Sequence, residues 1–289
     1  MKASLLLDAK ATLAEGPFWH PEEQLLYWVD IEQGYLHIYN PETKEDRLLP
    51  TGTRIGAVVP VKGNGAIVAL QNGLHKIDTQ TGALEFITNP LAEDIRFNDG
   101  RCDPSGRFWI GSMALDERNG AAALYRFDKD KSIHLMLNNV SISNGIVWTS
   151  DKKKMYYVDS PTKQITEFDY DDITGEISNR RVAVDIKIDG FPDGMIIDNE
   201  DKLWTALWGG CAVARWDPET SELLQKIEVD ALHVSACTFG GKNLNTLYIT
   251  TARKGLNAAQ LEEYPLSGSL FAIDLDIKGV PTEYYQGSL

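Results

Sequence analysis

The sequence has little positive charge, few cysteines and no long hydrophobic run. Its 28 Lys and Arg residues are outnumbered by 42 Asp and Glu residues, which gives a net charge of -14. So acidic a chain repels phosphate backbones and anionic headgroups, and we expect neither nucleic acid nor a membrane as partner. The three cysteines, Cys102, Cys211 and Cys237, form no CxxC pair, which is typical of a reduced cytoplasmic protein. The short apolar run at the start is interrupted by Asp8, so no signal peptide is predicted.

Several enzyme signatures are also missing. Without a GxSxG segment a serine esterase would lack its nucleophile, and the HExxH motif of zinc peptidases is absent too. The five histidines have no ligand spacing, and each is expected to be a surface or turn residue rather than a catalyst: His20, His37, His75, His134 and His233. Gly63-Asn64-Gly65 lacks the third glycine of a phosphate loop and predicts a hairpin turn instead. These absences leave oxygen-bearing side chains as the candidates for chemistry.

A short element recurs along the whole chain. A Gly or another small residue stands after a residue of variable type and before an apolar pair, as in Glu15-Gly16-Pro17-Phe18 and Asp193-Gly194-Met195-Ile196. In the six copies the small residue occupies positions 16, 56, 100, 145, 194 and 237, at intervals of 40 to 49 residues. A repeat of this length indicates an architecture built from equal structural units.

Each unit contains four strand-like runs. Segments such as LLYWVDI and KMYYVDS mix β-branched and aromatic residues, and turns opened by Asp or Asn separate them. Four strands in a unit of about 45 residues are typical of a propeller blade. We therefore predict an all-β fold over residues 1–289, a single six-bladed β-propeller with four antiparallel strands per blade. The strand Ser4–Leu7 precedes the first unit and is predicted to close the last blade beside Gly279–Gly287; a β-sandwich is the alternative.

The repeat also predicts which residues meet at one mouth of the central channel, because the innermost strand of each blade lines it. The equivalent positions hold Glu15, Ile55, Asn98 with Asp99, Asn144, Asp193 and Ser235 with Ala236. Carboxylate and amide oxygens gathered there are costly to bury without a partner, and a hard divalent cation suits them. Asp-Gly and Asn-Gly are common turn dipeptides as well, so purely structural turns are the alternative.

Longer motifs cover nearly the whole chain, from about Ala14 to Gly287. They include AEGPFWHPEEQLLYWVDI, RFNDGRCDPSGRFWIGSM, SNGIVWTSDKKKMYYVDS and PDGMIIDNEDKLWTA. These motifs resemble those of the regucalcin, gluconolactonase and sugar-lactonase family. The resemblance implies a six-bladed propeller that binds one divalent cation, calcium first, with zinc, manganese, magnesium and iron(II) as alternatives.

The same resemblance implies roles for single residues. The cation ligands would be Glu15, Asn144 and Asp193, from the EGP, SNG and PDG motifs. Arg96 and Asn98 of RFNDG would lie on the substrate side of the cation. Asp116, in SMALDE, stands where the family has a Glu that contacts sugar hydroxyls, so it is a third candidate for substrate binding.

The resulting hypothesis is metal-dependent hydrolysis of a sugar aldonolactone to the sugar acid. The cation would polarise the lactone carbonyl, Asp193 would serve as general base for water, and Arg96 with Asn98 would orient the sugar. Two alternatives keep the same site: a phosphotriester hydrolase and a non-catalytic calcium-binding regulatory protein. We expect a cytoplasmic monomer, because a propeller closes its own sheet edges.

Overall fold

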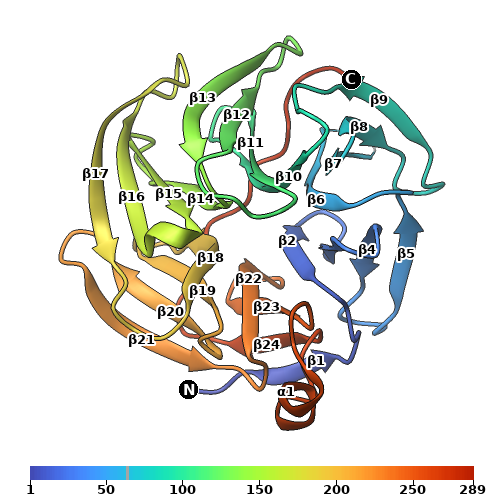
Figure 1. Ribbon diagram of the computed structural model, residues 1–289, viewed down its shortest axis with the longest axis vertical. Helices are drawn as coiled ribbons and strands as arrows, with labels where there is room; N and C mark the ends of the chain where they lie inside the picture. Colours follow the sequence, from blue (N-terminus) through green and yellow to red (C-terminus); the bar gives the residue numbers. More distant parts are fainter. Residues whose placement is uncertain (63–64) are drawn as a thin grey trace.

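The computed structural model describes residues 1–62 and 65–289, and antiparallel strands make up most of them. Four separate sheets have four strands each, ordered along the chain from the centre of the molecule outward (Figure 1). These sheets are β2–β5 (Ala14–His20, Leu25–Asp30, Tyr35–Tyr39, Asp46–Pro50), β6–β9 (Ile55–Pro60, Ala66–Leu70, Gly73–Ile77, Leu84–Thr88), β10–β13 (Ile95–Cys102, Phe108–Ala114, Ala122–Phe127, Ile133–Val140) and β14–β17 (Ser143–Trp148, Lys154–Asp159, Gln164–Tyr170, Ile177–Asp185).

A fifth sheet contains eight strands. One half of it is β18–β21, and the other half is β22–β24 together with β1. Their bounds are Phe191–Ile197, Leu203–Trp208, Ala212–Asp217 and Glu222–Glu228, then His233–Gly240, Thr246–Ala252, Leu270–Asp274 and Ser4–Leu7. The two halves meet where Trp208 of β19 pairs with His233 of β22.

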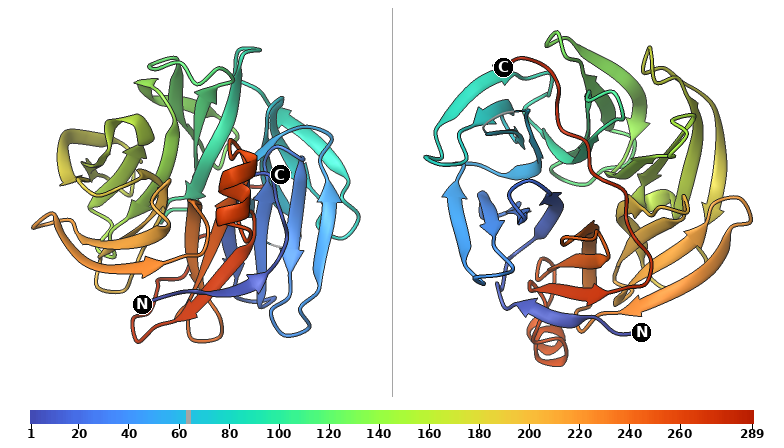
Figure 2. Two further views of the ribbon diagram at one scale, coloured as in Figure 1. Left: turned by 60° about the horizontal axis from the view of Figure 1, so that its bottom comes forward. Right: turned by 180° about the vertical axis from the view of Figure 1, so that it is seen from behind.

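The N-terminal strand β1 pairs antiparallel with β24, with Ser4 opposite Ala272. The prediction that β1 pairs with Gly279–Gly287 is wrong. That segment crosses the face of the molecule opposite to the one viewed in Figure 1 (Figure 2), and it meets the sheets at isolated bridges. Pro281 within it has no N–H to donate to a strand ladder, which disfavours a regular edge strand there.

The strands β2, β6, β10, β14, β18 and β22 lie nearest the centre (Figure 1), where each contacts the next and β22 contacts β2. The recurring glycines permit this close ring. A Cβ on Gly145 would lie 2.4 Å from the Cβ of Met195, and a Cβ on Gly194 would lie 2.4 Å from the Cβ of Ala236. In these copies, and at Gly56 against β10, the small residue of the repeat therefore lies where neighbouring inner strands touch.

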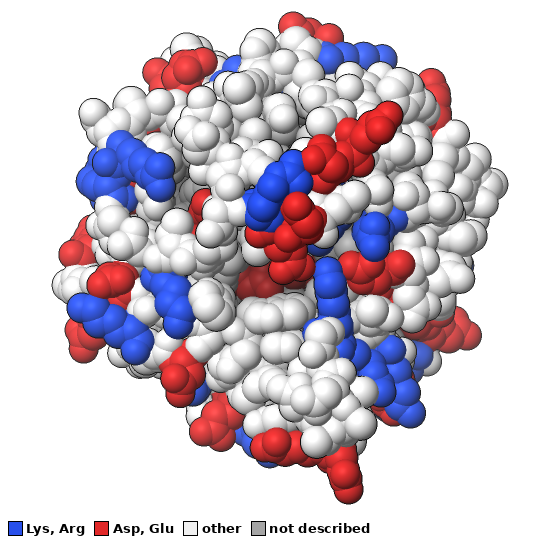
Figure 3. Space-filling view, viewed as in Figure 1, with Lys and Arg blue, Asp and Glu red and all other residues white. Residues whose placement is uncertain are grey.

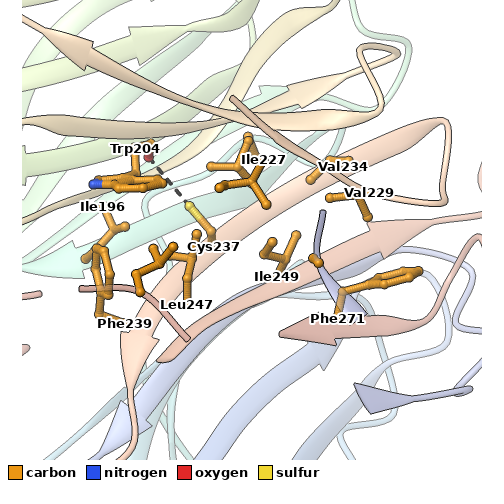
Figure 4. Close-up of a cluster of buried hydrophobic side chains, with 14 of the residues drawn as sticks. Ile196, Trp204, Ile227, Val229, Val234, Cys237, Phe239, Leu247, Ile249 and Phe271 are labelled. Atoms are coloured by element: carbon orange, nitrogen blue, oxygen red, sulfur yellow. Dashed lines mark hydrogen bonds between the residues drawn. The ribbon is translucent and has the colours of Figure 1, made fainter. Parts of the chain in front are cut away.

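Hydrophobic side chains fill the spaces between neighbouring sheets and between the two halves of the fifth sheet, where the cluster of Figure 4 lies. In that cluster the fully buried rings of Trp204 and Phe239 meet edge to face with centroids 5.6 Å apart. Cys237 belongs to this cluster, and its Sγ donates to the carbonyl oxygen of Trp204 at 3.5 Å. All three cysteines are free, as their spacing predicted, and Cys237 serves as a core residue.

Helix is scarce in the described residues, as the sequence predicted. The two helical segments are η1 (Ser160–Thr162) and α1 (Ala258–Glu263). Asn257 starts α1 with a capping box, because its side chain accepts from the backbone N–H of Gln260. Neither segment has the length and apolar character needed to cross a membrane. The hairpin turn predicted at Gly63-Asn64-Gly65 falls on residues 63–64, outside the described part of the chain.

Candidate metal and substrate site

The inner strands carry β-bulges at the residues that the repeat singles out. Pairing with the neighbouring strand shifts register at residues 15–18 of β2, 143–146 of β14 and 192–195 of β18. A bulge places an extra residue in one strand and redirects its side chain. This local geometry turns Glu15, Asn144 and Asp193 toward a common space.

That space is a cavity of about 530 Å³, and Glu15, Asn144 and Asp193 all line it. Its volume lies within the range of small-molecule sites. Figure 3 shows acidic atoms at the floor of a hollow in the centre of the face viewed in Figure 1. Arg96 and Asn98 line the same cavity, so the structure brings together five of the six candidate residues.

The two carboxylates are almost completely buried: Glu15 is 6% exposed and Asp193 is 7% exposed. Burial, followed by repulsion from Asp99, raises the pKa of Glu15 to about 8. Burial, followed by repulsion from Glu15, raises the pKa of Asp193 well above its ordinary value. Two ionised carboxylates in such a place need a cation, because neither can be solvated by water as it would be at the surface.

The amide of Asn144 has a fixed orientation. Its Nδ2 donates to Oγ of Ser160 at 2.7 Å, and that hydroxyl donates to the carbonyl oxygen of Pro192 at 2.6 Å. Its Oδ1 accepts from Nδ2 of Asn98 at 3.1 Å, which leaves the second lone pair of this oxygen available. Ser160, at the start of η1, was not a candidate in the sequence, yet it positions a candidate ligand.

Arg96 and Asn98 form a rigid pair on the wall of the cavity. Nη1 of Arg96 donates to Oδ1 of Asn98 at 2.8 Å and to the carbonyl oxygen of Phe97 at 2.9 Å. Nδ2 of Asn98 also donates to the carbonyl oxygen of Ser143 at 2.8 Å. Burial lowers the pKa of Arg96 to about 10, so its guanidinium is still charged at neutral pH. The pair presents a fixed cation and amide beside the buried carboxylates.

The donor set decides which cations fit. Within residues 1–62 and 65–289, no three His, Cys, Asp or Glu side chains gather as a metal cluster. A cation in this cavity would therefore bind two carboxylates, one amide oxygen and further oxygens from water or substrate. Such all-oxygen sets suit hard divalent cations, and positions filled by water leave room for a substrate.

Asp116 does not reach the cavity. Its side chain is 63% exposed and accepts from Nη1 of Arg118 at 2.8 Å. The next residue, Glu117, lines the cavity instead, and its Oε1 lies 3.6 Å from Nζ of Lys254. Glu117 has a φ of 58°, in the left-handed region, which turns its side chain away from the direction a regular strand would give.

Aromatic residues form part of the cavity wall. Trp208 stacks on His233, with ring centroids 4.1 Å apart and an interplanar angle of 7°. Both line the cavity, as does Phe191, whose ring is covered by Nζ of Lys163 at 4.5 Å. Burial lowers the pKa of His233, and its Nδ1 has no hydrogen-bond partner among the described residues. The expectation of a surface or turn histidine is wrong, because His233 pairs with Trp208 where the halves of the fifth sheet meet.

The chain is similar to known proteins over nearly its whole length. A family model described as the SMP-30/gluconolactonase/LRE-like region matches residues 13–253. A Bacillus subtilis protein that carries the provisional name sugar lactone lactonase YvrE is 37% identical over 292 residues, covering 100% of both chains. Pentonolactonase XacC of Haloferax volcanii is 32% identical, with 97% of each chain covered. The crystal structure of a calcium-binding protein, regucalcin, from Agrobacterium tumefaciens has a TM-score of 0.94 and 26% identity, covering 99% of this chain and 97% of the other.

Proposed function

Because the chain belongs to the SMP-30/gluconolactonase/LRE-like family, we propose that it hydrolyses a sugar lactone to the corresponding sugar acid with one divalent cation. The observation that carries the proposal is the buried pair Glu15 and Asp193 on the wall of a cavity of small-molecule size. The relatives named for lactonase activity on sugars and pentoses support the choice of substrate.

The proposed ligands of the cation are Glu15, Asn144 and Asp193. Two buried carboxylates with raised pKa values favour a bound cation, which would let both ionise at neutral pH. Calcium is our first choice because all three side chains offer oxygen and because regucalcin is described as a calcium-binding protein. Magnesium, manganese, zinc and iron(II) are alternatives, because geometry and availability also decide occupancy.

We assign separate roles in hydrolysis to the residues that line the cavity. A divalent cation bound there supplies Lewis acidity toward the lactone carbonyl oxygen. We assign Asp193 as the general base for the attacking water, since its carboxylate faces the cavity. Arg96 holds the sugar hydroxyls through the N–H groups that it does not use on Asn98 and Phe97. Both N–H groups of Asn98 are already donated, so Asn98 accepts from a sugar hydroxyl through the second lone pair of its Oδ1. Asp116 was a third candidate for this role, and we propose that Glu117 takes it, because only Glu117 lines the cavity.

The test is Asp193→Asn. This variant keeps the volume of the side chain but removes its basicity, and we expect lactone turnover to fall at least about a hundredfold. Its circular dichroism spectrum should match that of the parent chain, which would show that the fold is intact. Turnover near the parent rate would contradict the assignment of the base.

A non-catalytic calcium-binding protein is the second candidate, favoured by the description of regucalcin as calcium-binding. It predicts calcium binding without turnover of any lactone. Acid release from a panel of sugar lactones, with phosphotriesters added to the panel, separates it from both hydrolase hypotheses. The lactonase hypothesis expects a chelator-sensitive rate on at least one sugar lactone and none on the phosphotriesters.

We also propose that the described strands form one propeller domain of six blades. The four four-stranded sheets count as four blades. The eight-stranded sheet counts as two, because its halves meet through the single pair Trp208 and His233. A ring whose N-terminal strand pairs with the last sheet has few free edges, which favours a monomer, and free cysteines favour the cytoplasm.

A further inference from the structure

A second cavity, of about 570 Å³, opens directly beside the one that contains the buried carboxylates. The two spaces are contiguous because five residues line both, namely Arg96, Met113, Glu117, Lys254 and Gly255. A sugar lactone bound over Glu15 and Asp193 therefore has room to extend past Arg96 into the second cavity.

This second cavity is positively charged, unlike the molecule as a whole. Its charged lining residues are four cations and two carboxylates: Arg54, Arg96, Arg253, Lys254, Glu32 and Glu117. The lining thus carries two positive charges in excess, whereas the whole chain has a net charge of -14. Figure 3 shows Lys and Arg atoms beside the acidic hollow. A concave wall of one sign concentrates ligands of the other sign.

Both carboxylates of the cavity wall form ion pairs with lining cations. Oε2 of Glu32 accepts from Nε of Arg54 at 2.7 Å, and Oε1 of Glu32 lies 2.9 Å from Nζ of Lys254. Glu117 contacts Lys254 as well, at 3.6 Å. Glu32 and Glu117 thus balance the charges of Arg54 and Lys254, and the two positive charges in excess are those of Arg96 and Arg253.

Arg253 is the lining residue whose side chain is most available to bind an anion. Its backbone N–H donates to the carbonyl oxygen of Thr12 at 3.1 Å, which fixes the main chain at the cavity wall. Its guanidinium forms no ion pair or hydrogen bond with any residue that the structure describes. A planar guanidinium binds phosphate or carboxylate oxygens with two parallel hydrogen bonds, which gives geometric specificity as well as attraction.

We propose that the second cavity is a subsite for an anionic substituent, a phosphate or a carboxylate, carried by the lactone. Arg253 binds the anion directly, while Arg96, which lines both cavities, adds to the positive field. The inference rests on the proposed lactonase function and makes its substrate more specific: an anionic sugar lactone rather than a neutral one.

Turnover of matched lactones is the first test. Glucono-1,5-lactone, its 6-phosphate and glucaro-1,4-lactone compare a neutral sugar with a phosphate and with a carboxylate. We expect kcat/KM to be at least about tenfold higher for one of the two anionic lactones, mainly through KM, since an arginine makes charge-assisted bonds to it. Arg253→Ala should remove this preference and Arg253→Lys should restore part of it, whereas Arg47→Ala, an exposed arginine of β5, should leave it unchanged.

Direct binding of inorganic phosphate is the second test, and it does not depend on turnover. Calorimetric titration in excess chelator should detect phosphate binding in the parent chain and in Arg47→Ala, and lose it in Arg253→Ala. Binding of phosphate at Arg253 without hydrolysis of any lactone would reject the proposed function and keep the subsite. Equal kcat/KM on neutral and anionic lactones, or phosphate binding that Arg253→Ala does not weaken, would overturn the subsite.

Discussion

Ser160 controls the orientation of Asn144 at the scale of single residues. Its hydroxyl accepts from Nδ2 of Asn144 and donates to the carbonyl oxygen of Pro192, so the amide oxygen is turned toward the cavity. We expect Ser160→Ala to weaken calcium binding by about tenfold or more, as the loss of a residue that supports a metal ligand does. Calorimetric titration of chelator-treated protein with calcium measures the affinity, and Ser178→Ala, at an exposed serine, is the control. An affinity equal to that of the control would show that Asn144 needs no such support.

Glu15 makes the stability of the metal-free protein depend on pH. Its pKa rises from 4.5 to about 8, chiefly because the carboxyl is buried and then because Asp99 is near. Between these two values the folded chain binds more protons than the unfolded chain, so the free energy of unfolding falls as pH increases. Asp193, whose pKa is also raised, acts in the same direction.

Thermal unfolding in chelator should therefore move to lower temperature between about pH 5 and about pH 8. The shift should be smaller in Glu15→Gln, and saturating calcium should reduce it in the parent chain. An unfolding temperature that rises across this window in chelator, with no difference between the parent chain and Glu15→Gln, would contradict the buried-carboxylate account.

The sequence was sufficient to identify some site residues and insufficient for others. Glu15, Asn144 and Asp193 could be found because each precedes the small residue of a repeat, and that residue marks a bulge in an inner strand. Ser160 follows β15 in a short helical turn with no repeated pattern. Glu117 reaches the cavity through its positive φ, a backbone angle that composition and spacing do not encode.

At the scale of strands and turns, the glycines after Asn144 and Asp193 are packing requirements, whereas Gly16 after Glu15 is required for its φ of 51°. Gly145 follows Asn144 on β14, and a Cβ there would lie 2.4 Å from the Cβ and 2.7 Å from the backbone nitrogen of Met195 on β18. Backbone atoms cannot move aside as the end of a flexible side chain can. The contact between neighbouring inner strands would have to open, and the bulge that directs Asn144 would change with it.

We expect Gly145→Ala to lower the free energy of unfolding by about 2 kcal/mol or more, because it overpacks this contact. Gly120→Ala is the control, since that glycine has open space around it and costs only the strain of its positive φ, about 1 kcal/mol. Denaturant unfolding measures both variants. A smaller loss for Gly145→Ala than for Gly120→Ala would mean that the inner strands separate easily.

Strand identity could be predicted from the sequence, but one pairing could not. Runs of β-branched and aromatic residues gave the positions of strands such as β3 and β15, because such residues fit a pleated, half-buried surface. The partner of β1 depends instead on which strand edge remains unpaired in the last sheet. That edge is β24, whereas the segment expected there, Gly279–Gly287, crosses the far face (Figure 2).

For the whole molecule, the ring of inner strands explains why distant residues meet. Glu15 and Asp193 are far apart in the sequence, yet β2 and β18 both contact β22 and face the same cavity. Equal repeats allow this meeting to be predicted, because equivalent residues of each unit point to the same end of the channel. The charges of the second cavity could not be predicted in this way, since Arg54 and Arg253 come from loops between strands and not from the repeat.

The central claim is that one cation held by Glu15, Asn144 and Asp193 makes the chain a sugar lactonase. The most direct test is to remove divalent cations with chelator, assay acid release from a panel of sugar lactones, and then add calcium back in small steps. The account predicts that hydrolysis is lost with the cation and returns fully at one equivalent per chain, and that it does not return in Glu15→Gln. A lactone rate that chelator does not change, or that needs more than one cation per chain, would contradict it.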